Sequence, residues 1–206
     1  MGYMDVAELF HAFRLVSKPW QRIAEEKIDR EFESGVLVFH SGKDIRREVA
    51  ISDAREERMN LVTRVIFFQN ITRVGEQACY CAANLVVVDI SEGVERIGAS
   101  AFDQCRSLTA VYFPTTLTSI GQFAFAKYTS LDNVDLLHTN LQELRSQAFC
   151  ECSELNSMTI PDSLQRLGTH VFFFCSKLVP SNIIVNNTTI DSTSKVVAHF
   201  RSQQLN

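Results

Sequence analysis

Residues 155–175 read LNSMTIPDSLQRLGTHVFFFC, and this stretch decides the fold because its pattern recurs through most of the chain. It opens on Leu155, and leucines stand at the corresponding places 85, 108, 131 and 178. The steps between these leucines are 23, 23, 24 and 23 residues, and Val62 extends the series by one unit toward the amino terminus. Self-similarity with such a period indicates a repeat architecture.

Other apolar positions recur at fixed offsets from each leucine. A unit carries apolar residues three and five positions after its leucine, then a second apolar pair, a phenylalanine and, in most units, a cysteine. The columns are Val88, Val111, Val134 and Met158; Ile90, Phe113, Leu136 and Ile160; Val94, Leu117, Leu141 and Leu164; Ile97, Ile120, Leu144 and Leu167; Phe102, Phe125, Phe149 and Phe172; and Cys105, Cys152 and Cys175, with Tyr128 in the cysteine place of one unit.

The spacing within a unit has a structural interpretation. The alternation that follows each leucine predicts a short strand whose alternate side chains point inward. Turn residues such as 114–116 follow, and a glycine such as Gly98 precedes the Ala-Phe segment. Because one unit cannot bury its columns alone, stacked units are needed to cover them. We predict a repeat solenoid of about five repeats over residues 61–180, with Phe102, Phe125, Phe149 and Phe172 lying one above another.

The two ends of the chain differ from this pattern. Residues 1–60 carry 22 of the 44 charged residues, which marks a change of architecture near residue 60. Ser17 can cap a helix whose face contains Trp20 and Ile23. We predict an α-helical segment over residues 1–35, a linker or amino-terminal cap over 36–60 with a short strand at 36–40, and a carboxy-terminal loop and capping helix over 181–206, with 186–189 in the loop.

At these residues the chain resembles the BspA-like type of leucine-rich repeat, built on L-x-x-I-x-I-P-x-S-V-x-x-I-G-x-x-A-F-x-x-C. Residues 155–175 follow this pattern closely, and the resemblance covers about residues 62–178. Its departures are local: Val171 replaces the alanine, Tyr128 replaces a cysteine and Cys79 replaces the first phenylalanine. The resemblance implies a noncatalytic recognition scaffold made of short strands and turns, of a kind found on microbial cell surfaces and inside eukaryotic cells.

Residues 14–24, RLVSKPWQRIA, resemble the second half of an F-box, whose R-L-V-S-K-x-W-x-x-L-A stretch they follow. In that family such helices dock on the Skp-type adaptor of cullin ubiquitin ligases, and the repeats behind them hold the substrate. The match spans about residues 5–33, and the opening L-P-x-E-L-L helix of an F-box is absent. The resemblance implies adaptor docking through Leu15, Val16, Trp20 and Ile23.

The composition of the 206 residues is that of a globular protein, with 46% hydrophobic and 21% charged residues. A net charge of −4 and a pI near 5.7 give no basic footprint for phosphate backbones, so we expect no nucleic-acid partner. No apolar run approaches the roughly 18 residues of a membrane span, and Asp5 and Glu8 do not fit a signal peptide. We expect no membrane partner and a cytoplasmic or nuclear location, where the six cysteines stay reduced.

The motifs give no support to catalysis or cofactor binding. Cys79 and Cys81 are separated by one residue, as are Cys150 and Cys152, which is closer than is usual for zinc ligands. A cysteine in a repeat column packs like an apolar side chain, with a redox role as the less favoured alternative. The chain has no Gly-x-Ser-x-Gly stretch, and residues 41–44, SGKD, lack the first glycine of a phosphate loop. We expect no enzyme activity, no metal and no cofactor.

Outward side chains on the first strand of each repeat form the candidate binding surface. An aromatic residue, aliphatic residues and two carboxylates at its middle suit a protein partner with a basic rim and an apolar anchor. The convex side and the loops are the alternative surfaces. The predicted first-strand ladder consists of Arg64 and Ile66, Val87 and Asp89, Ala110 and Tyr112, Asn133 and Asp135, and Ser157 and Thr159.

Two main hypotheses of function follow. The first is a noncatalytic protein–protein interaction scaffold that serves as an F-box-type substrate receptor for a cullin ubiquitin ligase, with its client on the first-strand ladder. The alternative is a surface-exposed or secreted BspA-like adhesin that binds host or matrix proteins and carries glycans at the sequons of Asn70, Asn186 and Asn187. An enzyme is the third and least favoured hypothesis. It would require polar groups from different repeats to converge on one site.

Overall fold

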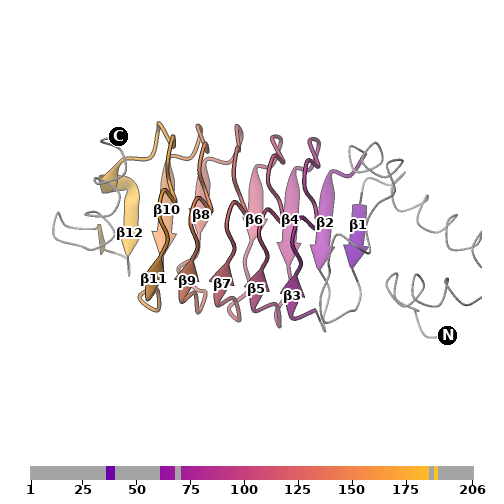
Figure 1. The fold of residues 1–206 in the computed structure, drawn as a ribbon, viewed down its shortest axis with the longest axis horizontal. Coiled ribbons are helices and arrows are strands. Elements are labelled where there is room, and N and C mark those ends of the chain that lie inside the picture. Colours follow the sequence, from indigo (N-terminus) through magenta and orange to yellow (C-terminus); the bar gives the residue numbers. More distant parts are fainter. Residues whose placement is uncertain (1–35, 40–60, 68–70, 186–187, 190–206) are drawn as a thin grey trace, which may run out of the picture.

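The computed structural model describes residues 36–39, 61–67, 71–185 and 188–189, which form a solenoid of short strands (Figure 1). The helices expected within residues 1–35 and 190–206 lie outside these ranges. The proposed adaptor-docking residues Leu15, Val16, Trp20 and Ile23 also lie outside them. The predicted repeat solenoid is confirmed for the central part of the chain.

The coils contribute strands to two rows that run along the long axis of the molecule (Figure 1). The first row consists of β1 (Val36–Phe39), β2 (Arg64–Phe67), β4 (Val87–Ile90), β6 (Ala110–Tyr112), β8 (Asn133–Asp135), β10 (Ser157–Ile160) and β12 (Ile183–Val185). The second row consists of β3 (Arg73–Val74), β5 (Arg96–Ile97), β7 (Ser119–Ile120), β9 (Glu143–Leu144) and β11 (Arg166–Leu167). Where successive strands of a row are hydrogen-bonded they pair in parallel, because every coil follows the same path.

The first row is divided and the second row is continuous. Backbone hydrogen bonds join the first row in two sheets, with the orders β1-β2-β4-β6 and β13-β12-β10-β8, where β13 is the short strand Thr188–Thr189. The second row is a single sheet from β3 to β11. Its strands stay in register beside the break, where Ser119 pairs with Glu143 and Ile120 with Leu144. The break therefore affects one side of the solenoid only.

The coil that follows the break is the one whose repeat has 24 residues. Its extra residue lies in the turn after β8, where residues 137–140 occupy the place that 114–116 take in the preceding coil. In this longer turn the Thr139 N–H donates to the Leu136 carbonyl at 3.0 Å. The regular register of β9 shows that the extra residue is accommodated before the second row begins.

The phenylalanine column forms the centre of the core, as predicted. Ring centroids are 5.3 Å apart from Phe102 to Phe125, 5.3 Å from Phe125 to Phe149 and 6.4 Å from Phe149 to Phe172, and all three pairs are stacked. The first coil has Cys79 in place of this ring, and there Phe67 packs edge-on against Phe102 with centroids 5.9 Å apart. All these rings are buried.

The cysteine column forms a second continuous feature of the core. Each side chain in this column is buried and donates a hydrogen bond to the carbonyl of the residue in the phenylalanine place one coil earlier. Tyr128 makes the same bond with its hydroxyl, which explains how it can replace a cysteine. The bonds are Cys105 Sγ to Cys79 O (3.1 Å), Tyr128 OH to Phe102 O (2.8 Å), Cys152 Sγ to Phe125 O (3.2 Å) and Cys175 Sγ to Phe149 O (3.0 Å).

Glycine is required where successive coils approach most closely. A Cβ added to Gly98 would lie 2.6 Å from the backbone of Gly75, and one added to Gly121 would lie 2.5 Å from the backbone of Gly98. The backbone atoms of Gly75 and Gly98 cannot move aside for an added Cβ as a flexible side chain could. Arg145 stands at the corresponding place of the 24-residue repeat, so this coil interrupts the glycine column.

The first row of strands continues beyond the repeats at both ends. β1 confirms the strand predicted at 36–40 and pairs with β2, Val36 opposite Arg64. At the other end a short 3₁₀ helix, η2 (Pro180–Asn182), leads into β12, and β13 (Thr188–Thr189) pairs antiparallel with β12. A loop was expected here, but Thr188 and Thr189 are β-favouring residues that extend the sheet across the end of the last coil.

Candidate binding surfaces

The first-strand ladder lies on the outer side of the first row, but it is not one continuous surface. Alternate residues of β2 and β4 are buried, which turns the ladder residues outward. The break between β6 and β8 divides them into two groups, where a single ladder was expected. The aligned sets are Arg64, Val87, Ala110 and Ile66, Asp89, Tyr112 before the break, and Asn133, Ser157 and Asp135, Thr159 after it.

Both ladder carboxylates are already engaged by neighbouring side chains. Arg64 forms an ion pair with Asp89, and its Nε donates to Asp89 Oδ2 at 2.8 Å. Asp135 accepts a hydrogen bond from the Thr159 hydroxyl and another, 3.0 Å long, from the Leu137 N–H. The bond from Thr159 holds the pKa of the Asp135 carboxyl below its ordinary value. These carboxylates stabilise the ladder itself, so they offer a basic partner less free charge than the sequence suggests.

Tyr112 is the exposed aromatic residue of the ladder. It is the last residue of β6, and 60% of its surface is exposed. Its place on a paired strand fixes its backbone, with Asp89 opposite it on β4. A rigid aromatic side chain on a strand can bury a large area against a partner at a small entropic cost.

A second ladder, which the sequence analysis missed, lies on the outer side of the second row. It consists of the residues that immediately precede the buried aliphatic column of Val74, Ile97 and their counterparts. The position could have been found from the repeat alignment, because it lies one residue before a column that was identified. The second-strand ladder, aligned strand by strand, is Arg73, Arg96, Ser119, Glu143 and Arg166.

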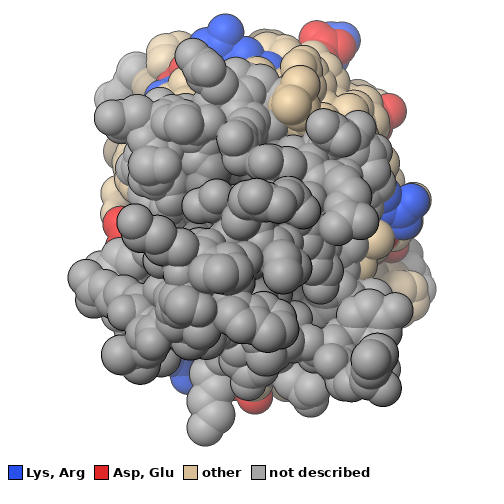
Figure 2. Space-filling model, turned by 90° about the vertical axis from the view of Figure 1, so that its right-hand side faces the viewer, with Lys and Arg blue, Asp and Glu red and all other residues tan. Residues whose placement is uncertain are grey.

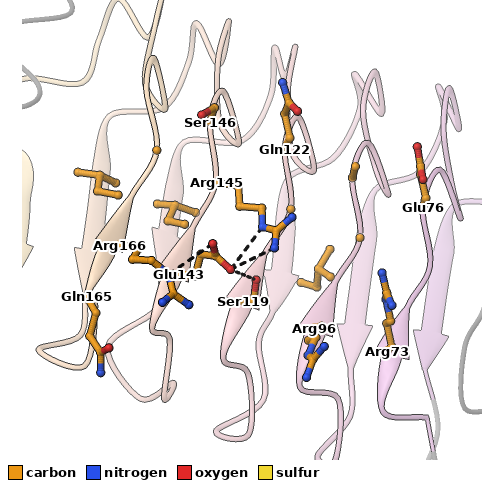
Figure 3. A pocket seen from close by; sticks show the side chains of 17 residues that line it. Arg73, Glu76, Arg96, Ser119, Gln122, Glu143, Arg145, Ser146, Gln165 and Arg166 are labelled. Atoms are coloured by element: carbon orange, nitrogen blue, oxygen red, sulfur yellow. Dashed lines mark hydrogen bonds and ion pairs between the residues drawn. The ribbon is translucent and has the colours of Figure 1, made fainter.

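The second-strand ladder lines a groove of about 750 Å³ that runs across all the strands of the second row (Figure 3). Arg145 from the interrupted glycine column joins its wall, and Gln122 and Ser146 lie along the same edge. The groove also contains Glu76, which Figure 3 shows beyond the end of Arg73. Its lining is therefore largely polar and contains more arginines than carboxylates.

The Glu143 carboxylate contacts three other side chains near one end of this groove. Its carboxylate lies 3.3 Å from Arg145 Nε and 3.5 Å from Arg166 Nε, and it accepts a 3.3 Å hydrogen bond from the Ser119 hydroxyl (Figure 3). The side chains of Arg145 and Arg166 remain 59% and 67% exposed. Glu143 thus holds two guanidinium groups over the groove without covering them.

Charge of both signs is present elsewhere on the surface. A view turned by 90° from Figure 1 shows Lys and Arg side chains together with Asp and Glu side chains around the outline of the molecule (Figure 2). Lys177 and Glu154, for example, form an exposed ion pair.

Five of the six cysteines are buried like packing residues, and Cys81 is partly exposed. Burial raises the pKa of the Cys79 thiol to about 12 and that of Cys150 also to about 12. A thiol that resists ionisation is a poor nucleophile and a poor metal ligand. All six cysteines are free thiols.

One buried carboxyl stands apart from both ladders. Asp103 is 7% exposed, and its Oδ1 has no hydrogen-bond partner within the described residues. Burial raises the pKa of this carboxyl above its ordinary value.

Across the residues that the structure describes, no group of three or more His, Cys, Asp and Glu side chains is arranged to hold a metal ion. Among the described residues there is also no helix with the length and apolar character that a membrane crossing requires.

Similarity to solved structures is confined to repeat proteins of low sequence identity. The chain is similar to a leucine-rich repeat protein from Eubacterium ventriosum (TM-score 0.62, 19% identity), to the T. pallidum leucine-rich repeat protein TpLRR (0.58, 21%) and to the pneumococcal vaccine antigen PcpA (0.56, 18%). The matches cover 75%, 83% and 68% of this chain, and 41%, 83% and 39% of the other chains in the same order. The chain thus spans less than half the length of the first and third, and at these identities the likeness shows the fold alone.

The family model described as BspA type leucine rich repeat region matches residues 61–195 in six copies, where about five repeats were predicted. No significant match was found among curated proteins. Because the family match begins at residue 61, it gives no support to the F-box resemblance of residues 14–24. A match over more than half of the chain, together with the stacked leucine, phenylalanine and cysteine columns, shows that the protein belongs to the BspA type leucine-rich repeat family.

Proposed function

We propose that the protein is a noncatalytic protein-binding scaffold that contacts its partner through the first-strand ladder, with Tyr112 as the anchor. The observation that carries this proposal is the 60% exposure of an aromatic side chain on a paired strand. Scaffolds of this family and fold are typically binding proteins. Beside Tyr112 the end of β6 has no hydrogen-bonded strand partner on the side of β8.

Affinity capture from the native source tests the ladder. The wild type is compared with the double variant Tyr112→Ala, Asp135→Arg, and Phe174→Ala serves as the control. Phe174 is 66% exposed and lies outside the ladder, so its loss removes a similar apolar area elsewhere. We expect the double variant alone to lose a partner that the other two retain. Identical partner lists for all three proteins would show that the ladder is not the binding face.

The adhesin setting has more support than the ligase setting. The family match and the similarity to a protein described as a vaccine antigen both favour a surface-exposed or secreted scaffold that binds host or matrix proteins. The intact mass of the protein from its native source tests this setting. Glycans at Asn70, Asn186 or Asn187 support it, and an unmodified chain recovered from the cytosol or nucleus contradicts it.

The substrate-receptor hypothesis rests on residues 14–24 alone. A pull-down with a Skp-type adaptor tests it directly, with Trp20→Ala as the variant. Adaptor capture that depends on Trp20 supports a cytoplasmic or nuclear ligase subunit. Equal capture by both proteins, or capture by neither, removes the ligase role and leaves the scaffold proposal intact.

A further inference from the structure

The groove over the second row is a surface separate from the first-strand ladder. Inward residues of both rows, such as Val65 and Val74, belong to one hydrophobic core. The outward residues of the two rows therefore leave that core in different directions. A ligand in the groove would not contact Tyr112, so the groove needs its own functional explanation.

The groove concentrates positive charge in an acidic protein. Its lining contains the arginines Arg73, Arg96, Arg145 and Arg166 against the carboxylates Glu76 and Glu143, although the whole chain has a net charge of −4. Arg73 and Arg96 stand directly opposite each other on β3 and β5. Their guanidinium groups bring positive charge from neighbouring strands to this end of the groove.

The arginines at the other end are positioned but still available. Glu143 engages the Nε of Arg145 and of Arg166, and both side chains remain mostly exposed. A guanidinium carries five N–H donors and binds a carboxylate best with two of them in parallel. Glu143 therefore engages only part of each guanidinium group, through Nε of Arg166 and through Nε and one Nη of Arg145, and both side chains remain open to solvent.

The dimensions of the groove fit an extended peptide. Neighbouring strands lie about 4.8 Å apart, so Arg96 on β5 and Arg166 on β11 are separated by about 14 Å. Extended chain rises about 3.3 Å per residue, so two side chains four residues apart lie about 13 Å from each other on the same face. Two carboxylates at that spacing can reach both ends of the groove at once.

We propose that this groove binds an extended acidic peptide segment of a partner protein, with one carboxylate bound by Arg96 and a second, four residues along, bound by Arg166 on the side that faces away from Glu143. Glu76 and Glu143 interrupt the positive charge of the groove, which disfavours a polyphosphate chain with charge at every unit more than a peptide whose carboxylates are four residues apart. The ladder residue Ser119, midway between the two ends, leaves room for an uncharged middle of the peptide.

Fluorescence polarisation with the purified full chain tests the proposal at low ionic strength, where charge pairs are least screened. The probe is a labelled peptide, SETVTES, with two glutamates separated by three residues. A second probe, SQTVTQS, replaces both by glutamine, and a third is a twelve-nucleotide oligothymidylate. We expect the glutamate peptide to bind at least about tenfold more tightly than the glutamine peptide, as the loss of one charged contact predicts.

Matched variants separate groove binding from general charge attraction. Arg96→Ser places in β5 the residue that β7 already has at this position, and it should weaken binding of the glutamate peptide about tenfold. Arg64→Ser removes the same charge from the first row and should leave the affinity unchanged, as should Tyr112→Ala. Equal binding of the two peptides, equal losses for Arg96→Ser and Arg64→Ser, or tighter binding of the oligothymidylate would each overturn the proposal.

Discussion

At the step from β6 and β7 to β8 and β9 the two rows of strands differ. The first row loses its backbone pairing there, whereas the second row keeps β7 paired with β9 in regular register. The same coil has the extra residue of the 24-residue repeat and Arg145 in place of a glycine. In a solenoid, stability is the sum of contacts between neighbouring coils, so the core and the second row must hold the two halves together at this interface.

The largest effect is expected from removing the core contact that crosses the interface. Phe125 stacks on both Phe102 and Phe149 with centroids 5.3 Å away on each side. Phe125→Ala should lower the free energy of unfolding by about 3–5 kcal/mol, through lost burial and the cavity left behind. Urea denaturation measures this loss. Phe174→Ala, at an exposed ring, should change stability by less than about 0.5 kcal/mol. Similar values for the two variants would show that the phenylalanine column does not hold the halves together.

A smaller loss is expected when the close approach of coils in the second row is blocked. Gly121→Ala would place a Cβ 2.5 Å from the backbone of Gly98, and the required shift should cost about 1–3 kcal/mol. The control is Arg145→Gly, which restores glycine where the column is interrupted and should alter stability by less than about 1 kcal/mol. Thermal or urea denaturation of the pair distinguishes the two sites. A neutral Gly121→Ala would mean that the second row can relax as the first row does.

The hydrogen bond of Tyr128 sharpens the comparison within the core. Tyr128→Phe keeps the ring but removes the donor to the buried Phe102 carbonyl, and this should lower the free energy of unfolding by about 1–2 kcal/mol. Tyr112→Phe, which removes the same hydroxyl from an exposed ring, should have almost no effect. Denaturation curves for both proteins give the difference directly. If the two substitutions have the same effect, the bond does not contribute to the stacking of coils.

The smallest effect concerns the cause of the break itself. Deleting His138 shortens the turn after β8 to the length found in the preceding coil. We expect β6 and β8 to pair, with a gain of about 0.5–1 kcal/mol for each new hydrogen bond. Slower hydrogen–deuterium exchange at the amides of residues 131–134 reports the pairing. The control is deletion of Thr115 from the preceding turn, which has the regular length. This deletion should speed hydrogen–deuterium exchange at the same amides. Unchanged exchange after the His138 deletion would assign the break to another feature of this coil.

Much of this architecture could be predicted, because a residue buried in every coil has to be apolar in every repeat. The leucine, phenylalanine and cysteine columns follow from that requirement alone. The strands of the second row were not predicted because they are only two residues long, as in Arg96–Ile97, where one residue is exposed and the other buried. The step of 24 residues was visible in the sequence, but which row it would interrupt depends on the conformation of a turn.

The binding surfaces were only partly predictable for a related reason. The alternation along β2 and β4 fixes which side chains point outward, so the first-strand ladder was placed correctly on the outer face. Pairing between ladder residues depends on register. The contact of Arg64 with Asp89 joins residues 25 positions apart, and it became apparent only when β2 and β4 were aligned. Outward residues also lack the periodic constraint of the core, so the arginines of the second row form no repeating apolar pattern.

The thiols at positions 105, 152 and 175 are each buried, and each donates a hydrogen bond to a backbone carbonyl of the previous coil. A sulfur held in this way is shielded from oxidants and has no need of a covalent partner. The spine of the molecule can therefore keep one chemical state in the reducing interior of a cell and in the oxidising medium outside it. These three cysteines report how the coils are joined, and they carry no information about the compartment in which the coils work.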